Sequence, residues 1–107
     1  MDTLELLTKA IKLQKPISFE YDVEKKVKGK RYGNPYAVFL HPTTDNVMGH
    51  IYQTDGVSDT KDEIPGWRSP LLSYIKNIKI LEDQDCFIVD ESYKPNSPMY
   101  ARVIAKV

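Results

Sequence analysis

The sequence predicts a mainly β fold with a flanking N-terminal helix, built as a small SH3-like or Sm-like barrel or as a strongly bent antiparallel sheet. Three observations support this fold class. An apolar stripe with helical spacing occurs at the N-terminus, an alternation of apolar and polar residues follows Pro16, and clusters of turn residues then recur along the chain. The chain has 107 residues, a length typical of one small domain.

The N-terminal helix is expected over residues 3–14. Its apolar stripe consists of Leu4, Leu7, Ala10 and Ile11. Asp2 stands where an N-cap belongs, and Glu5 follows three residues later, which is the pattern of a capping box. Pro16 cannot continue a helix and is therefore expected to end this one.

Several short strands are expected after the helix. They lie at residues 17–24, 30–41, 47–54, 67–72 and 76–81, with a further short apolar piece at 87–89. Pro35 and Pro70 fall within two of these strands. Because proline cannot donate a backbone hydrogen bond, we expect an edge position or a bulge at each of them. The acidic segment 55–66 has few apolar residues and is expected to form a mobile loop.

The C-terminal segment fits a helix better than a strand. Ser97 and Pro98 form a favourable N-cap and first-turn pair. The apolar residues that follow are Met99, Tyr100, Val103, Ile104 and Val107. Their spacing is closer to a helical period than to strict alternation. The sequence therefore predicts a short C-terminal helix within residues 97–107.

The composition argues against several classes of protein. Hydrophobic residues make up 41% of the chain, which is enough for a core and argues against global disorder. No apolar run approaches the roughly 20 residues of a membrane-spanning helix. The first 13 residues lack the features of a signal peptide. The single Cys86, in an apolar stretch, is expected to be a buried, reduced thiol, so we expect a cytoplasmic protein with no membrane association.

The charges are balanced overall but segregated along the chain. The 15 Lys and Arg equal the 15 Asp and Glu, which argues against strong nonspecific binding of nucleic acid. Residues 9–32 carry a net charge of +5, residues 45–63 carry −4, and residues 82–91 hold five acids and no base. This asymmetry is consistent with a two-sided surface. Charged, solvated loops are the simpler interpretation.

The sequence contains no recognisable catalytic or metal-binding motif. His41 precedes Pro42 in a turn, and His50 lies within an expected strand, where it faces either a ligand or solvent. No Cys or His stands at metal-ligand spacing, and there is no nucleophile elbow or phosphate-binding glycine loop. The sequence therefore predicts a protein that is not an enzyme and that holds no metal or cofactor.

Basic and aromatic residues in or beside the expected strands are the best candidates for a ligand site. Arg31 and Arg68 would present planar donors suited to phosphate or carboxylate. Tyr52, Trp67 and Tyr74 would stack on a base. The competing interpretation places each aromatic ring in the core or at its rim, with the polar tip in water.

The order of these features resembles the WYL domain, a bacterial module with an Sm-like or SH3-like barrel. The likeness spans residues 4–87. The matching pieces are, in chain order, Ala10-Ile11, Ile17-Ser18-Phe19-Glu20-Tyr21, Arg31, Pro35, Ile51-Tyr52, Trp67-Arg68, Leu71-Leu72, Tyr74-Ile75, Ile78-Lys79-Ile80-Leu81 and Phe87. The Trp-Tyr-Leu triplet that names the family is absent at residues 47–49, and Tyr74 stands where the family usually has an arginine. No DNA-binding domain is expected beside the domain in a chain of this length.

The resemblance implies a non-enzymatic, regulatory ligand-binding module. WYL domains are thought to sense ligands, often nucleic acids or nucleotides, and the family's basic ligand-facing positions map onto Arg31 and Arg68. We therefore expect an anionic ligand such as single-stranded nucleic acid or a nucleotide. The further candidate contacts are Tyr52, Trp67, Tyr74 and His50. The alternative is a protein–protein interaction or self-association module without a nucleic-acid ligand, in which a basic face meets an acidic segment of a partner or second copy.

Overall fold

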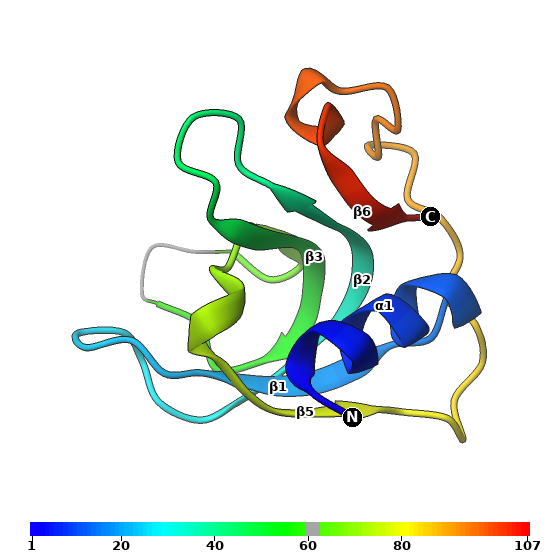
Figure 1. The fold of residues 1–107 in the computed structure, drawn as a ribbon. Coiled ribbons are helices and arrows are strands. Elements are labelled where there is room, and N and C mark those ends of the chain that lie inside the picture. The colour runs from blue at the N-terminus through cyan, green and yellow to red at the C-terminus, as the bar shows by residue number, and fades with distance from the viewer. Residues whose placement is uncertain (60–62) are drawn as a thin grey trace.

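The chain folds into one bent antiparallel sheet with a helix packed against it, as the computed structural model of residues 1–59 and 63–107 describes (Figure 1). The elements of these described residues are α1 (Thr3–Leu13), β1 (Ile17–Tyr21), β2 (Lys30–Leu40), β3 (Val47–Gly56), β4 (Gly66–Arg68), the 3-10 turn η1 (Leu72–Tyr74), β5 (Ile75–Ile80), the 3-10 turn η2 (Pro98–Tyr100) and β6 (Val103–Lys106). The expected mainly β class with a flanking N-terminal helix is confirmed. The expected loop at 55–66 includes residues 60–62, which lie outside the described residues.

Strand β2 is the centre of the sheet. The strand order is β4-β3-β2-β1-β5, and every described pairing is antiparallel. β3 runs along the whole of β2. On the other side of β2, β1 pairs with its first part and β6 with its second part. A long strand shared in this way bends, and its two halves then belong to different parts of the sheet.

The sheet is bent but does not close into a barrel among the described residues. Its two end strands, β4 and β5, are joined through η1 and do not pair with each other. The connection is held by an isolated bridge between Met48 and Leu71 and by the amide of Gly49, which donates to the carbonyl of Pro70 over 2.9 Å. Of the two architectures that the sequence allowed, the strongly bent sheet is therefore the observed one.

Helix α1 has the predicted cap and covers the main core. Asp2 Oδ1 accepts a hydrogen bond from the amide of Glu5 over 2.8 Å, and Glu5 Oε1 accepts one from the amide of Asp2 over 3.4 Å, which completes the capping box. Leu7, Ala10 and Ile11 are buried on its inner face. The main core consists of Leu7, Ala10, Ile11, Ile17, Phe19, Val38, Ile51, Ile75 and Ile80. In the described part of the chain, no helix has both the length and the apolar character to cross a membrane.

The two prolines expected at edges or bulges behave differently. Pro35 lies in the central strand rather than at an edge, and the register of β2 against β3 shifts between Pro35 and Ala37. The bulge therefore accommodates the missing N–H. Pro70 lies beyond β4, because that strand ends at Arg68 instead of at the expected residue 72.

The C-terminal segment is a correction to the sequence prediction. Ser97 and Pro98 do begin a turn, and Ser97 Oγ accepts from the amide of Met99 over 3.4 Å. The turn ends after three residues, and β6 follows in place of the expected helix. The reason is a tertiary pairing: the second part of β2 has open backbone groups on one side, and β6 pairs with them.

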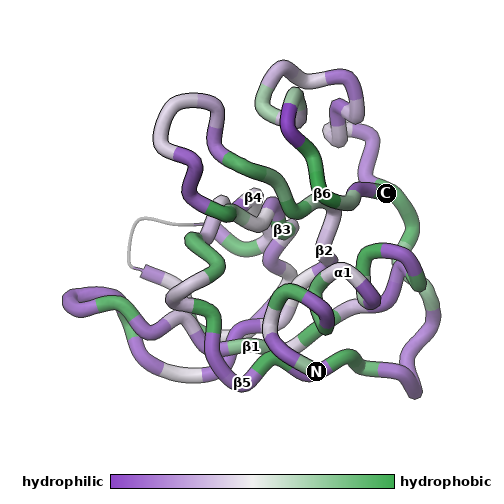
Figure 2. The backbone as a smooth tube through the Cα atoms, viewed as in Figure 1, coloured by the Kyte–Doolittle hydropathy of each residue, from purple (hydrophilic) through white to green (hydrophobic). Residues whose placement is uncertain are grey.

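Cys86 is a second correction, because its thiol is exposed rather than buried. Residues 82–91 form no strand, so the alternation that would bury every second residue is absent. Only Phe87 is buried there, and its ring lies 5.0 Å from that of Tyr36. Ile88 is 91% exposed. Figure 2 shows hydrophobic residues along α1 and the central strands, and a largely hydrophilic turn between β1 and β2.

Candidate functional site

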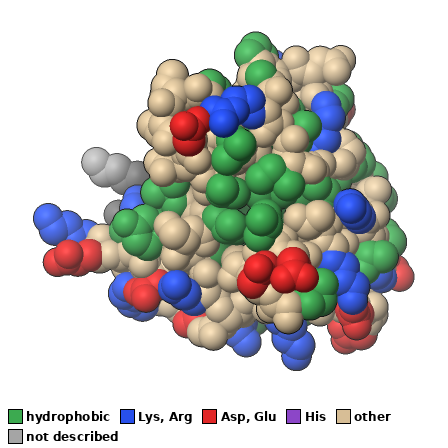
Figure 3. Space-filling view, in the orientation of Figure 1, with side chains coloured by type: hydrophobic (Ala, Val, Ile, Leu, Met, Phe, Trp, Pro, Cys, Tyr) green, Lys and Arg blue, Asp and Glu red, His purple; other side chains and the backbone are tan. Residues whose placement is uncertain are grey.

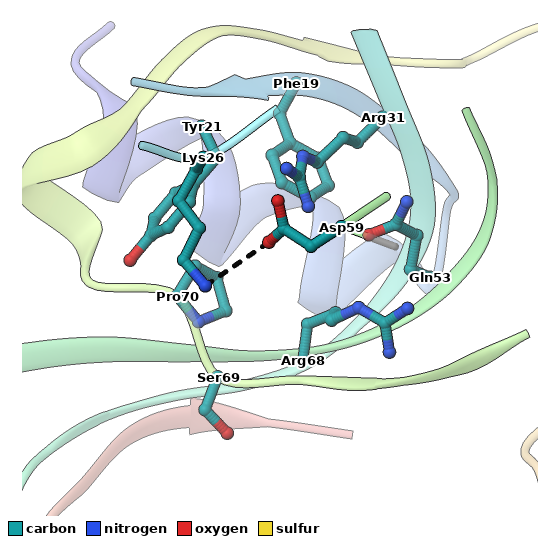
Figure 4. Close-up of a pocket in the computed structure, with 9 residues that line it drawn as sticks. All are labelled: Phe19, Tyr21, Lys26, Arg31, Gln53, Asp59, Arg68, Ser69 and Pro70. Carbon is teal, nitrogen blue, oxygen red and sulfur yellow. Dashed lines mark ion pairs between the residues drawn. The ribbon is translucent and has the colours of Figure 1, made fainter. Parts of the chain in front are cut away.

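A cavity of about 190 Å³ lies at the end of the sheet where β1, β2, β3 and the segment after β4 converge (Figure 4). Its lining residues are Phe19, Tyr21, Lys26, Arg31, Gln53, Asp59, Arg68, Ser69 and Pro70. The volume is below the roughly 300–1,000 Å³ of pockets that enclose a whole drug-sized ligand. The cavity therefore suits a compact group, such as one anionic end of a larger ligand.

Strand register explains why these residues meet. Phe19 of β1 is paired with Arg31 of β2, and Gly33, two residues further along β2, is paired with Gln53 of β3. Side chains two residues apart on a strand share a face, so Arg31 and Gln53 lie on the same face of the sheet. Arg68 of β4 reaches this face as well, because its partner Ile51 is two residues from Gln53. The topology thus brings two arginines together that are 37 positions apart in the sequence.

Arg31 is almost completely buried, with only 4% of its surface exposed. Its Nη2 donates to the carbonyl of Val27 over 3.2 Å, and its guanidinium lies 6.0 Å from the centre of the Tyr21 ring. Its Nε has no hydrogen-bond partner within the described residues. A buried donor without a partner costs roughly 1–3 kcal/mol, so this atom favours an incoming acceptor.

Arg68 also lines the cavity, and its two terminal nitrogens are fixed by hydrogen bonds. Nη1 donates to the carbonyl of Trp67 over 3.0 Å, and Nη2 donates to the carbonyl of Glu63 over 2.8 Å and to Ser58 Oγ over 3.2 Å. Its Nε is also buried and lacks a partner in residues 1–59 and 63–107. The two arginines that line the cavity therefore each keep one buried donor without a partner among the described residues.

Gln53 contributes a buried acceptor. It is fully buried, and its Nε2 donates to the carbonyls of Asp55 (3.2 Å) and Val57 (2.8 Å), which fixes the amide. Its Oε1 has no partner among the residues that the structure describes. The described lining residues thus carry two buried donor atoms and one buried acceptor atom without partners, and a ligand with both oxygens and a hydroxyl would satisfy all three.

Asp59 places one carboxylate among the cations of the cavity. It pairs with Lys26 Nζ over 3.3 Å, and its Oδ1 accepts from the amide of Val27 over 3.0 Å (Figure 4). The Val27 amide, followed by Lys26 and Arg31, lowers the pKa of the Asp59 carboxyl below its ordinary value. Lys26, Arg31 and Arg68 against this carboxylate give the described part of the lining a formal charge of +2.

We expect Asp59→Asn to tighten the binding of an anion at this cavity. The amide oxygen of asparagine can still accept from Val27, while one negative charge is removed from the lining. Because Asp59 is partly solvated, the expected gain is modest, about two- to fivefold in Kd. Isothermal titration with inorganic phosphate measures it, and weaker binding by the variant would contradict the expectation.

The predicted site residues divide into two groups. Arg31 and Arg68 line the cavity, whereas Tyr52, Trp67 and His50 lie on the opposite face of β3 and β4, because neighbouring residues of a strand point to opposite faces. Tyr74 is 41% exposed, and its ring lies edge-on to Tyr21, with the centres 6.1 Å apart. Tyr74 therefore contacts the lining residue Tyr21 but does not itself line the cavity.

The second group forms an aromatic cluster, which consists of Tyr36, His50, Tyr52, Trp67, Phe87, Tyr93 and Tyr100. The His50 ring stacks on Trp67 with centres 4.5 Å apart and planes at 28°. His50 Nδ1 hydrogen-bonds with Tyr100 Oη, and Trp67 Nε1 donates to Ser92 Oγ over 2.9 Å. These rings are half-buried or buried, and they pack η2, which precedes β6, and the 87–93 segment against the sheet.

The pH dependence of stability is expected to report on His50. Burial lowers the pKa of its imidazole below the ordinary value of 6.5. The folded state therefore disfavours the proton that the unfolded chain accepts near pH 6.5, so stability is complete above that pH and falls as the pH decreases below it. Urea unfolding at pH 7.5 and pH 5.5 should show a lower midpoint at pH 5.5. The loss should be smaller in His50→Asn, and an equal loss would contradict this assignment.

Sequence reasoning missed Tyr21, Lys26, Gln53 and Asp59 as parts of the site. Tyr21 was expected only as an alternating strand residue, and Asp59 only as a member of a charged loop. The segregation of charge was the available signal, since Lys26 belongs to the basic segment and Asp59 to the acidic one. Among the described residues, no group of three or more His, Cys, Asp or Glu is placed to hold a metal ion.

Comparison with known proteins gives no match. No family model, no curated protein and no solved structure matches this chain. The case for a function therefore depends on the cavity and on the residues that line it.

Proposed function

We propose that this chain is a non-enzymatic, WYL-like regulatory module that binds the anionic group of a single-stranded nucleic acid or nucleotide at the cavity between Arg31 and Arg68. The observation that carries the proposal is the convergence of two arginines on one cavity, each with a buried Nε donor that has no partner among the described residues. Hydrogen bonds between arginine and phosphate are among the strongest that proteins form.

The surroundings of the cavity support the same ligand chemistry. The turn between β1 and β2 carries Lys25, Lys26 and Lys28, and Lys30 follows at the start of β2. Lys26 of this turn and Arg31 of β2 line the cavity. Lys28 already pairs with Asp22 over 2.7 Å. Lys26 pairs with Asp59, and Lys25 and Lys30 would attract a polyanion and increase its rate of association.

Binding should be salt-dependent. A 3′-labelled single-stranded RNA or DNA oligonucleotide is expected to bind with micromolar or tighter affinity at low salt, measured by fluorescence anisotropy. Neutralisation of about three phosphates of a single strand gives a slope near −2 in a plot of log K against log salt concentration. Absence of binding at low salt would contradict the proposal.

A protein-interaction or self-association module is the second candidate, and exposed apolar side chains favour it. Ile88 and Val89 are 91% and 42% exposed within the acidic segment 82–91, and Leu13 and Ile104 are each 44% exposed. Figure 3 shows hydrophobic side chains gathered near the middle of one face, with acidic side chains beside them. Light scattering at several salt concentrations tests self-association, and a monomer at high protein concentration would argue against it.

A further inference from the structure

The charge of the cavity distinguishes between kinds of phosphate. Among the residues that the structure describes, Lys26, Arg31 and Arg68 together with Asp59 give the lining a formal charge of +2. An internal phosphodiester carries one negative charge and would leave the site positive. A terminal phosphate monoester carries about −1.5 to −2 at pH 7 and therefore comes close to balancing the site.

The unused hydrogen-bonding atoms suit a phosphate together with part of its sugar. The Nε atoms of Arg31 and Arg68 are donors that need an acceptor, and phosphate oxygens supply it. Gln53 Oε1 is an acceptor that needs a donor. A sugar hydroxyl next to the phosphate can supply that donor, as the 2′-hydroxyl of a ribonucleotide does.

The size of the cavity suits the terminal phosphate of a nucleic-acid strand or nucleotide. The volume of about 190 Å³ is smaller than that of a pocket that encloses a whole drug-sized ligand. That space holds one phosphate and part of a sugar. An internal phosphodiester would bring a nucleoside on each side into the same confined region.

Building on the proposed function, we propose that the cavity formed by Arg31, Gln53, Arg68 and Lys26 recognises a terminal phosphate monoester, either the 5′-phosphate of a single strand or that of a free nucleotide, in preference to an internal phosphodiester. The proposal specifies which phosphate enters the cavity. The basic turn between β1 and β2 then contacts whatever part of the ligand extends beyond it.

The test compares three oligonucleotides of one sequence, all labelled at the 3′ end. One has a 5′-phosphate, one a 5′-hydroxyl, and one a 5′-phosphate blocked as its methyl ester. We expect the free 5′-phosphate to bind at least about tenfold more tightly than the other two, the size of one charge-assisted hydrogen bond. This preference should disappear in Arg31→Lys/Arg68→Lys, which keeps the charge and loses the planar donors.

The outcomes separate this inference from the proposed function. Equal affinity for all three oligonucleotides, still dependent on the two arginines, would overturn the terminal-phosphate inference and leave the proposed function intact. No binding of any oligonucleotide or of adenosine monophosphate would overturn both. Competition by adenosine monophosphate as strong as that of the 5′-phosphorylated strand identifies a free nucleotide as the ligand, and much weaker competition identifies a strand end. Both of these results support recognition of the monoester.

Discussion

Replacement of both Arg31 and Arg68 by alanine is expected to abolish binding of the anionic ligand. Each guanidinium has a buried Nε without a partner among the described residues, so each can contribute a charge-assisted hydrogen bond. Such a bond contributes about 1.5–3 kcal/mol, and Arg68→Ala alone should therefore weaken binding by about 12- to 150-fold. The double variant should show no binding at micromolar protein concentration in fluorescence anisotropy.

A matched control separates a specific site from general electrostatics. Lys12→Ala/Lys79→Ala removes the same two positive charges at exposed positions outside the cavity lining. It should bind within a few-fold of the wild type at moderate salt, because exposed charges are screened there. Circular dichroism must show that the arginine variant is folded, since Arg31 is buried. Equal affinity of the wild type and the folded arginine variant would refute the site.

Tyr36→Ala is expected to cause the largest loss of stability. Tyr36 is fully buried at the centre of the aromatic cluster, where its ring lies 4.8 Å from both Trp67 and Tyr93 and 5.0 Å from Phe87. Removal of a large buried ring typically costs about 3–5 kcal/mol, because the lost transfer free energy adds to the cost of the cavity that remains. Its hydroxyl also accepts from the amide of Asp90 over 2.8 Å.

Tyr36→Phe is the control, because it keeps the ring and removes only that hydrogen bond. Its expected cost is about 0.5–1.5 kcal/mol. Urea unfolding followed by far-ultraviolet circular dichroism measures both variants, and it avoids the fluorescence of the neighbouring Trp67. Similar losses in the two variants would show that the hydrogen bond, and not ring packing, holds the 87–93 segment against the sheet.

Local signals in the sequence predicted the N-terminal helix and the first three strands well. The capping box at Asp2 and Glu5 depends on residues three positions apart, and the alternation in β1 reflects the period of a strand. The C-terminal segment shows the limit of such signals. Ser97 and Pro98 begin a turn as their chemistry requires, yet β6 follows because the open side of β2 offers backbone partners. No local pattern contains that information.

The candidate site shows the same division between what local sequence signals predict and what tertiary pairing decides. Residue chemistry and a family resemblance singled out Arg31 and Arg68, and strand periodicity separated Trp67 from Arg68 and Tyr52 from Gln53. Only the pairing of β1, β2, β3 and β4 decided that both arginines share one cavity. The tertiary structure also placed Gln53 and Asp59 in the lining of this cavity. The face on which a strand side chain lies follows from the alternation along its own strand. The residues that it contacts on that face come from strands and loops that are distant in sequence.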